Sequence, residues 1–471
     1  MKYIGREKEM RLLRNLLPSS EAELAVVYGR RRVGKSSLIK EAYKEQKLFS
    51  FEGLEEATEK EQLNNFHAQL LDHFPNAKSS TPAGWYEALS ILNENIKNKE
   101  CVVLLDELQW LASYKGKFVS ILKQIWDQKF SKNNRLTMLL CGSVASFMVN
   151  KVIKSKALYG RSTTNVHLLP FKLRETGQYL HGLSNEEIIQ AQILVGGIPG
   201  YLNKLRQHDS VILGIQHLAF ETHGYFKNEF ERIFISQFGK NQNYEKIVRH
   251  LADHPNGLTR KQIADLPDIS NGGTLSTCLS DLEIAGVVSS YYSFDMSPTT
   301  KKRIFILSDP YCRLYLSFIE KNLERIDSNV PNIFTNIIKT PHFNSWMGLG
   351  AELMCYNHKH ELAKLMGFSD IIYNAGPYLS KKTKKTDPSL QIDLVYSRKD
   401  SVITVCEVKY GAKIGLDVID EVKIKIEKLD KFKNKTIQAA LIYKNKPSKE
   451  VLNSAYFNHM IALEDLINIS L

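Results

Sequence analysis

The sequence predicts a multidomain α/β protein whose first domain is built on a parallel sheet. A glycine-rich loop at residues 29–36 lies between a short apolar run at 24–28 and a segment of helical character at 37–43. Two later apolar runs, at 101–107 and 135–143, both end in polar side chains. Short apolar strands that alternate with helices are typical of a parallel sheet covered by helices on both faces.

Length and composition indicate a globular chain of several domains. With 471 residues the chain is long enough for about three domains, and 43% of it is hydrophobic and 24% charged, which is ordinary. The formal net charge of +12 favours an anionic partner such as nucleic acid, although a basic solvated surface would give the same excess.

The cysteines and the apolar runs bear on the compartment. The six cysteines are scattered without a CxxC pair, which argues against a zinc ribbon or a disulfide framework and fits a reducing cytoplasm. The first residues lead directly into a charged segment, so we expect no signal peptide. No run of about 18 apolar residues occurs, so we expect no membrane span and a cytoplasmic protein.

The loop at 29–36, Gly-Arg-Arg-Arg-Val-Gly-Lys-Ser, fits the phosphate-binding pattern G-x-x-x-x-G-K-[ST]. Its glycines allow a tight turn that brings backbone N–H groups onto phosphate oxygens. We expect Lys35 to reach the β- and γ-phosphates of ATP and Ser36 to ligate Mg²⁺. A glycine-rich turn before a basic helix is the alternative, and the strand–loop–helix context disfavours it. The predicted nucleotide-binding residues of this loop are Gly29, Arg32, Val33, Gly34, Lys35, Ser36 and Ser37.

The run 101–107 has the form of a Walker B motif, an apolar strand that ends in two acids. We expect Asp106 to hold Mg²⁺ through water and Glu107 to orient the attacking water as a base. This chemistry requires an acid at the carboxyl end of a strand beside the strand of the phosphate loop. A buried strand ending in solvated acids is the simpler interpretation of the motif alone, and the preceding loop favours the functional one.

Two more polar residues each allow two interpretations. Ser143 follows the strand 135–143 and is either a sensor of the γ-phosphate or the N-cap of a following helix. Arg161 is either an arginine finger, acting in cis or across a subunit interface, or an ordinary surface arginine. The remaining predicted elements of this domain are a helix within 4–17, a strand at 49–51, helices at 59–73 and 85–96, and a last strand at 166–171.

The middle of the chain is predicted to be helical and then to change character. Residues 173–231 are helical in pattern, with a break at 196–202 that suits a hinge or a helix start and would place a lid near the nucleotide. Residues 243–310 suggest three helices and a hairpin, the winged-helix arrangement. The third helix, 274–285, carries no Arg or Lys, which favours a structural or protein-contact module over a reader of DNA bases.

The C-terminal part carries a second group of acids. Period-two alternation places Glu407 and Lys409 on one face of a strand, and Asp393 on the neighbouring strand can meet them. Two carboxylates bind a hard ion such as Mg²⁺, a lysine can orient or deprotonate water, and Glu352 could complete the group. A surface hairpin with a charge pair is the alternative. The other predictions are a linker at 327–332, a helix from 346 to about 366, a strand at 370–374, a basic loop at 381–385, strands at 391–396, 402–409 and 437–443, and a helix at 416–434.

The whole set of motifs resembles a prokaryotic family of P-loop ATPases, the AAA-related STAND group with a C-terminal restriction-endonuclease-like domain, and the resemblance covers essentially the whole chain. It implies that the first motif packs near the adenine, that Pro199 in the lid contacts nucleotide, and that Ser143 and Arg161 act as sensor and finger. The motifs that carry it are Ile4–Glu7, Gly29–Ser36, Leu104–Glu107, Cys141–Ser143, Tyr159–Arg161, Gly197–Pro199, and Asp393 with Glu407–Lys409.

The C-terminal part is similar to the PD-(D/E)xK nuclease fold. The resemblance implies that Glu352, Asp393 and Glu407 are its acids and Lys409 its lysine, with Ile392 in place of the proline of that pattern. We therefore expect a Mg²⁺-dependent ATP switch coupled to a nuclease-like domain that acts on nucleic acid, with DNA preferred. The alternative is a nucleotide-regulated DNA- or protein-binding protein with an inactive nuclease-like domain; either could form a nucleotide-dependent homo-oligomer. The expected domains are an ATPase core at 1–172, a lid at 173–240, a winged helix at 241–326 and a nuclease-like domain at 335–471.

Overall fold

The computed structural model divides into two compact units. The first comprises Met1–Pro170 with Ile233–Lys240, and the second comprises Phe171–Arg232 with Asn241–Leu471. The chain therefore leaves the second unit and re-enters the first within one helix, α12 (Glu229–Phe238). The residues described below are 3–17, 19–112, 117–155, 158, 160–269, 272–292, 303–379, 391–411, 413–429 and 434–469.

The first unit is organised around a five-stranded sheet with the strand order β2-β3-β4-β1-β5, in which every pair is parallel. The order corrects one expectation: β3, which ends in the acids, is not the neighbour of β1, because β4 lies between them. The strands are β1 (Glu23–Tyr28), β2 (Leu48–Glu52), β3 (Cys101–Asp106), β4 (Leu136–Gly142) and β5 (Thr164–His167).

The last strand begins and ends earlier than predicted. β5 covers Thr164–His167 rather than 166–171. The last backbone bond to β1 runs from Leu168 N to Tyr28 O, and Pro170 has no N–H with which to continue the ladder.

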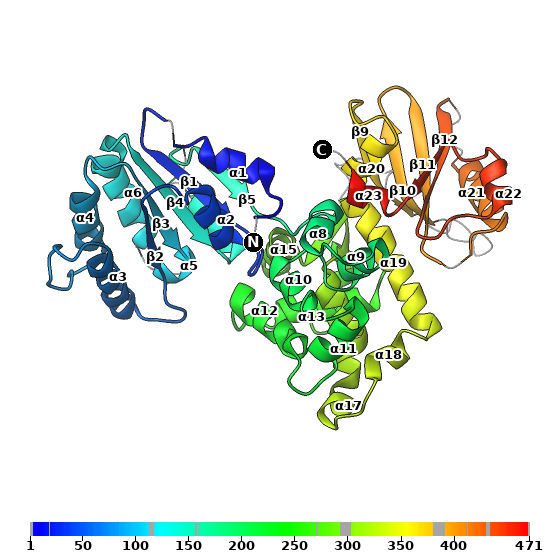
Figure 1. Cartoon of the computed structure of the whole chain (residues 1–471), viewed down its shortest axis with the longest axis horizontal. Helices are drawn as coiled ribbons and strands as arrows, with labels where there is room; N and C mark the ends of the chain where they lie inside the picture. Colours follow the sequence, from blue (N-terminus) through cyan, green and yellow to red (C-terminus); the bar gives the residue numbers. More distant parts are fainter. Residues whose placement is uncertain are drawn as a thin grey trace. The chain divides into compact units, whose positions relative to one another are not determined.

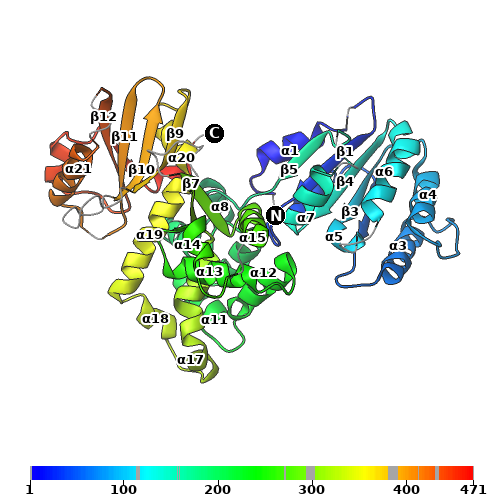
Figure 2. The same cartoon turned by 180° about the vertical axis from the view of Figure 1, so that it is seen from behind.

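Helices cover both faces of this sheet (Figures 1 and 2). The side chains of α1 and α2 pack on one face, and those of α3, α4 and α6 on the other, forming two separate apolar clusters. The helices of this unit are α1 (Glu7–Arg14), α2 (Lys35–Ala42), α3 (Glu59–His73), α4 (Trp85–Ile96), α5 (Leu108–Leu111), α6 (Phe118–Gln128), the 3₁₀ helix Phe130–Lys132, α7 (Ala145–Phe147) and the π-helix Met148–Ile153.

The second unit begins with short helices, and the predicted break at 196–202 is a helix start. α10 begins at Pro199, a residue suited to a first helical turn. Gly197 lies against the backbone of Phe171: a Cβ there would be 2.0 Å from the Phe171 carbonyl oxygen, so only glycine fits. The helices are α8 (Leu173–Tyr179), α9 (Asn185–Leu194), α10 (Pro199–Leu205), α11 (Val211–Ala219), the 3₁₀ helix Tyr225–Lys227, and α12.

The next segment has three helices and an antiparallel sheet, in the order predicted for a winged helix. The sheet order is β6-β8-β7, and Gly286 (φ 73°) ends α15 in a left-handed turn. The predicted turn of this hairpin, at 295–301, lies outside the described residues. The elements are α13 (Asn243–Asp253), β6 (Leu258–Thr259), α14 (Arg260–Ala264), α15 (Gly273–Ile284), β7 (Val288–Tyr292) and β8 (Arg303–Leu307).

The helical stretch after β8 changes its pitch along its length. Residue 327, predicted to begin a linker, is instead the last residue of α17. The elements are α16 (Pro310–Leu314), a π-helix (Tyr315–Ile319), a 3₁₀ helix (Glu320–Asn322), α17 (Leu323–Asp327) and α18 (Ile333–Ile337).

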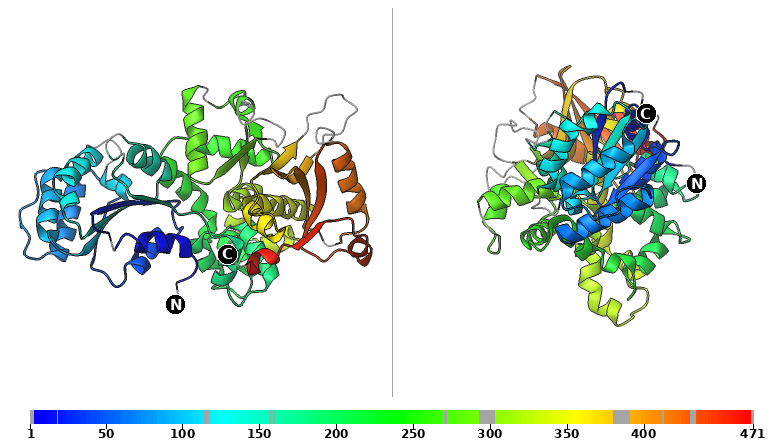
Figure 3. Two further views of the ribbon diagram at one scale, coloured as in Figure 1. Left: turned by 90° about the horizontal axis from the view of Figure 1, so that it is seen from above. Right: turned by 90° about the vertical axis from the view of Figure 1, so that its left-hand side faces the viewer.

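The C-terminal part is a mixed five-stranded sheet with the order β13-β12-β11-β10-β9. Helix α19 packs against β10 and β11, and α21 covers the other face (Figure 3). Its elements are α19 (Pro341–Asn357), α20 (Lys359–Leu365), β9 (Tyr373–Leu379), β10 (Gln391–Arg398), β11 (Val402–Lys409), α21 (Asp417–Glu427), β12 (Thr436–Tyr443), α22 (Lys449–Asn453), β13 (His459–Ala462) and α23 (Asp465–Asn468).

Two predicted boundaries in this part were wrong. Helix α19 begins at Pro341 rather than 346, because the Thr340 hydroxyl accepts a hydrogen bond from the Phe343 N–H and caps the helix. The strand predicted at 370–374 is β9, which runs from Tyr373 to Leu379. The predicted basic loop at 381–385 lies outside the described residues.

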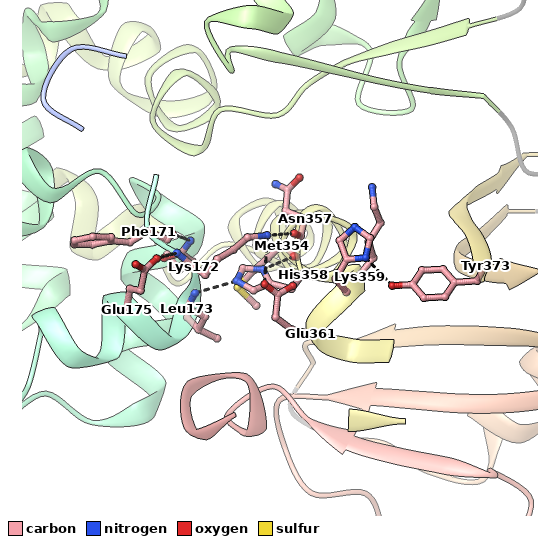
Figure 4. Close-up of polar contacts among 12 residues, drawn as sticks. Phe171, Lys172, Leu173, Glu175, Met354, Asn357, His358, Lys359, Glu361 and Tyr373 are labelled. Carbon is pink, nitrogen blue, oxygen red and sulfur yellow. Dashed lines mark hydrogen bonds and ion pairs between the residues drawn. The ribbon is translucent and has the colours of Figure 1, made fainter. Parts of the chain in front are cut away.

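A buried histidine joins the end of α19 to the start of α8 (Figure 4). The Nε2 of His358 accepts from the Leu173 N–H at 2.9 Å, and its Nδ1 donates to the Met354 carbonyl at 2.8 Å. This arrangement requires the neutral ring, and burial, followed by the charge of Lys172, lowers the pKa of His358 to about 4. Lys172 in turn donates to the carbonyl of Asn357.

Within the described part of the chain, no helix combines the length and the apolar character needed to cross a membrane.

Candidate functional site

The phosphate loop joins β1 to α2 through an unusual backbone path. Gly29 has a φ of 154°, and a Cβ there would lie 2.3 Å from the carbonyl oxygen of Leu168. Gly34 and Arg32 have φ angles of 94° and 67°, in the left-handed region. Successive turns of this kind let several N–H groups face one anion. Beneath the loop Val33 is buried in the core, whereas Ser37 is exposed on α2.

Lys35 is a buried cation at the mouth of this loop. Its side chain is 6% exposed, and its Nζ donates to the carbonyls of Gly29 at 3.1 Å and Arg30 at 3.2 Å. Its side chain makes no ion pair with any described residue. A buried ammonium whose only partners are carbonyls fits a polyanion such as a triphosphate.

Ser36, in the first turn of α2, contacts Asp106, the last residue of β3, at the carboxyl ends of the strands. The contact forms although β4 lies between β3 and β1, the strand that leads into the phosphate loop. The Ser36 hydroxyl donates to Asp106 Oδ2 at 2.8 Å, and Asp106 Oδ1 accepts from the N–H of Glu107 at 2.9 Å. A hydroxyl and a carboxylate oxygen in contact are the donor types that Mg²⁺ takes in nucleotide sites. These residues therefore fit a magnesium ion bound with a nucleotide.

Glu107 is held by several donors in a strained backbone conformation. Its φ of 48° is left-handed, which costs on the order of 1 kcal/mol or more outside glycine. Its Oε2 accepts from the Ser143 hydroxyl at 2.6 Å, the Ser143 N–H at 3.2 Å and Gln109 Nε2 at 2.6 Å. The interpretation of Ser143 as an N-cap was wrong, because Val144 occupies the N-cap of α7. The sensor role of Ser143 stays a prediction.

Two glutamines of this network were missed from the sequence. Gln109 is fully buried, and its Nε2 also donates to Ser143 Oγ at 3.1 Å. Gln237 in α12 donates from Nε2 to the Ser143 carbonyl at 3.0 Å. The signal for Gln109 was a single polar residue in the apolar run 108–111, whereas Gln237 had no local signal.

A cavity of about 410 Å³ lies beside Glu107. Its lining includes Glu52, at the end of β2, and Arg31, in the phosphate loop. Burial, followed by the charges of Asp106 and Glu107, raises the pKa of Glu52 above its ordinary value. Three neighbouring carboxylates make this end of the sheet negative, which suits a bound cation.

The two predicted arginines occupy different places. Nη2 of Arg6 donates to the Val33 carbonyl at 3.4 Å, so the first motif contacts the phosphate loop. Arg161 forms a bidentate pair with Asp127, from Nε to Oδ1 at 2.6 Å and from Nη2 to Oδ2 at 2.9 Å. Tyr159 of the same motif lies outside the described residues.

Arg161 lies near the amino end of β1, whereas the phosphate loop follows the carboxyl end of that strand. It precedes β5, and the parallel register pairs Thr164 with Ala25, near the start of β1. The loop begins at Gly29, beyond the other end of β1, and Ala25 and Gly29 are about 13 Å apart at about 3.3 Å per residue. This position disfavours action in cis, and the role of Arg161 as an arginine finger stays a prediction.

Pro199 lies in the second compact unit, at the first turn of α10. Its contact with nucleotide stays a prediction.

The second predicted group brings its acids together. Asp393 Oδ2 accepts from the Val408 N–H at 2.8 Å, and Glu407 pairs with Lys409 at 3.1 Å. Burial, and then the charge of Glu407, raises the pKa of Glu352 to about 7 and that of Asp393 well above its usual range. The three carboxylates are therefore close enough to repel one another.

The same group does not form a metal-ligand set in this structure. Glu407 is also paired with Lys425 of α21, a partner that the sequence analysis missed, so both of its oxygens have a lysine partner. Lys409 pairs in addition with Glu421 at 2.6 Å. Among the described residues, no three His, Cys, Asp or Glu side chains are arranged to hold a metal ion.

The first unit is a P-loop nucleotide-binding domain. It has a parallel sheet, a glycine loop between a strand and a helix, and an acid that contacts the loop. Residues 3–205 match the family described as "ATPase domain predominantly from Archaea". This part of the chain is an ATPase domain, and the protein is an ATPase.

Three known proteins are similar to this chain. "Uncharacterized protein MJECL04" of Methanocaldococcus jannaschii is 24% identical over 367 residues, which cover 77% of this chain and 78% of that protein. The Walker-type ATPase PABY2304 of Pyrococcus abyssi superposes with a TM-score of 0.50 and 20% identity, over 67% of this chain and 96% of that one. The ORC2 protein of Aeropyrum pernix reaches a TM-score of 0.44 and 16% identity, over 72% of this chain and 97% of that one.

Proposed function

We propose that the protein is an ATP-driven, Mg²⁺-dependent switch whose second unit acts on nucleic acid. The observation that carries the switch is the hydrogen bond between Ser36 and Asp106, which brings the phosphate loop and the acidic strand end together. A magnesium ion bound there would neutralise charge on the triphosphate. Lys35 binds the β- and γ-phosphates, and Glu107, held through Oε2, keeps Oε1 to orient the attacking water.

Arg161 is proposed to complete this site in a second copy of the chain. Arg161 lies near the amino end of β1 and pairs with Asp127. We therefore place its contact with a phosphate at an interface with the second copy. Replacement of Arg161 by Ala should lower ATP turnover at high protein concentration and leave nucleotide affinity unchanged. Turnover per molecule that is independent of protein concentration in the wild type would contradict this role.

The second unit is proposed to respond to the nucleotide through its helical lid and winged helix. The net charge of +12 supports a nucleic-acid partner, with DNA preferred, whereas the third helix without Arg or Lys gives the winged helix a structural or protein-contact role. The division into an ATPase core, lid, winged helix and nuclease-like domain is part of the proposal. Its lid was predicted to end at 240, whereas Ile233–Lys240 packs with the first unit.

A nuclease-like activity of the C-terminal part is a second candidate. The mutual repulsion of Glu352, Asp393 and Glu407 favours it, because a divalent cation would relieve that repulsion and supply a Lewis acid for phosphodiester hydrolysis. Such a cation would have to displace Lys425 from Glu407. If it does not, this part is a binding platform without cleavage.

ATP turnover tests the switch. Lys35→Ala and Glu107→Gln should each lower turnover at least a hundredfold, with nucleotide affinity lost in the first and retained in the second. Lys44→Ala changes an exposed lysine just after α2 and should have no effect. Equal turnover in all four proteins would refute the proposal.

Cleavage of labelled DNA and RNA with Mg²⁺ or Mn²⁺, with and without ATP, tests the second candidate. Asp393→Asn should abolish cleavage, whereas Asp400→Asn, which changes an acid on a nearby turn, should not. If the wild type cleaves no more than Asp393→Asn does, only the binding role is left. A gel-shift measurement with the same nucleic acids would detect that role.

A further inference from the structure

Arg313 is a buried cation with few partners. Its side chain is 6% exposed, its Nη2 donates to the Trp346 carbonyl at 3.3 Å, and its guanidinium lies 4.7 Å from the centre of the Trp346 ring. It makes no ion pair with any described residue. A guanidinium has five N–H donors, so most of those of Arg313 have no acceptor within the described part of the protein. The charges of Glu352 and Asp309 favour the charged form of Arg313, but neither acid forms an ion pair with it, so the N–H groups of this buried cation that lack an acceptor need a reason.

The free side of Arg313 faces a cavity of about 450 Å³, within the range of small-molecule sites. The cavity lies between α13 and β8 of the three-helix segment and α19 of the C-terminal part, all in the second compact unit. Its walls are mainly apolar, formed by Leu251, Leu307, Trp346, Leu349 and Leu353. An apolar cavity with one buried cation selects a ligand that is apolar over most of its surface and anionic at one end.

The other polar groups of the cavity agree with this selection. Ser317 Oγ accepts from Trp346 Nε1 at 3.1 Å, which leaves the hydroxyl hydrogen as a donor. At the mouth, Lys321 and His342 make neither a hydrogen bond nor an ion pair with any described residue. Asp253 is the only acid among the described residues of the lining, so positive charge prevails.

We propose that this cavity binds a small organic anion, with a carboxylate or phosphate on Arg313 and Ser317 and a flat apolar body against the leucines and Trp346. The ligand would bridge the three-helix segment and α19, and would therefore stabilise their packing. The site is separate from the phosphate loop and does not depend on ATP hydrolysis.

Calorimetric titration with three probes of the same shape tests the proposal. The full chain is first saturated with ADP and Mg²⁺ to fill the phosphate loop, and is then titrated with 2-naphthoate, 2-naphthyl phosphate or uncharged 2-naphthol. We expect at least one anion to bind with a Kd below about 1 mM, as ligands of this size can, and 2-naphthol to bind at least about tenfold more weakly. The ratio between the two anions decides whether a carboxylate or a phosphate is preferred.

Arg313→Met keeps the length of the side chain and removes its charge. It should weaken the anion about tenfold to a hundredfold, as loss of a charged hydrogen bond does. Arg325→Met changes an exposed arginine of α17 in the same unit and should leave the Kd unchanged.

A second variant serves in case Arg313→Met disturbs the packing on Trp346. Ser345 is exposed and lines the cavity, so Ser345→Trp should block binding of both anions without changing the melting temperature. The proposal is overturned if neither anion binds with a Kd below about 1 mM, if 2-naphthol binds less than about tenfold more weakly than the tighter anion, or if both variants bind the anions as the wild type does.

Discussion

Replacement of Gln109 by Leu isolates what the buried amide does for Glu107. The two side chains are similar in size. The change removes the hydrogen bonds from Nε2 to Glu107 Oε2, 2.6 Å, and to Ser143 Oγ, 3.1 Å. Oε1 of Gln109 has no hydrogen-bond partner in the described part of the chain, so its removal also eliminates an unsatisfied buried acceptor.

The expected effects on stability and on turnover therefore differ. A hydrogen bond to a charged group contributes about 1.5–3 kcal/mol, and here that group is the carboxylate that orients water. If this orientation is lost in the transition state alone, kcat falls about tenfold to a hundredfold while KM changes little. The free energy of unfolding should fall by less than about 2 kcal/mol, because loss of the unsatisfied Oε1 offsets part of the loss.

Steady-state ATP hydrolysis at saturating Mg²⁺, with thermal denaturation of the same samples, measures both effects. Gln128→Leu is the matched control, since Gln128 lies on α6 of the same unit and its Oε1 accepts a bond only from the Tyr86 hydroxyl among the described residues. A kcat for Gln109→Leu equal to or above the wild-type value would refute the reasoning, because it would mean that the amide restrains Glu107 rather than aligning it.

Three further predictions concern the second unit. Gly197→Ala should lower the free energy of unfolding by about 3 kcal/mol, because its Cβ would lie 2.0 Å from the backbone oxygen of Phe171; a urea midpoint equal to that of the wild type would contradict this. Gly348→Ala, on α19 with no atom within 4 Å of the new Cβ, should raise the stability by up to about 1 kcal/mol in the same measurement. His358 has a folded pKa of about 4, below its unfolded value, so the stability it contributes is fully present above about pH 6.5 and is lost as the pH falls toward 4. About 2 kcal/mol should disappear between pH 7 and pH 5 in the wild type and much less in His358→Gln, and equal pH profiles would exclude the bond to Leu173 as the cause.

The sequence predicted the phosphate loop and its surroundings because they are local. Eight consecutive residues specify the turn: Gly29 and Gly34 occupy positions where close packing or a left-handed backbone excludes most side chains, and Arg32 between them also takes a left-handed φ. Alternation along β11 likewise predicted that Glu407 and Lys409 share a face, and their 3.1 Å ion pair confirms it. In both cases the relevant distance is fixed by backbone geometry over a few residues.

Partners from distant segments could not be predicted in this way. Gln237 reaches Ser143 across 94 positions of sequence, and Lys425 reaches Glu407 from a separate helix. The cation Arg313 and the leucine and tryptophan walls around it come from separate segments with no common motif. Their proximity follows from how helices pack, which periodicity alone does not encode.

The sequence by itself determined that this chain has a nucleotide-binding loop, an acidic strand end and a second group of acids, because each is a short pattern with its own backbone geometry. Only the tertiary structure decided how they are used. The sheet has β4 between β1 and β3, and Ser36 still reaches Asp106. The parallel pairing of β5 with β1 places Arg161 near the amino end of β1. The physical reason is that strand order and helix packing are settled by burial of apolar surface over the whole domain, not by the residues of any one motif.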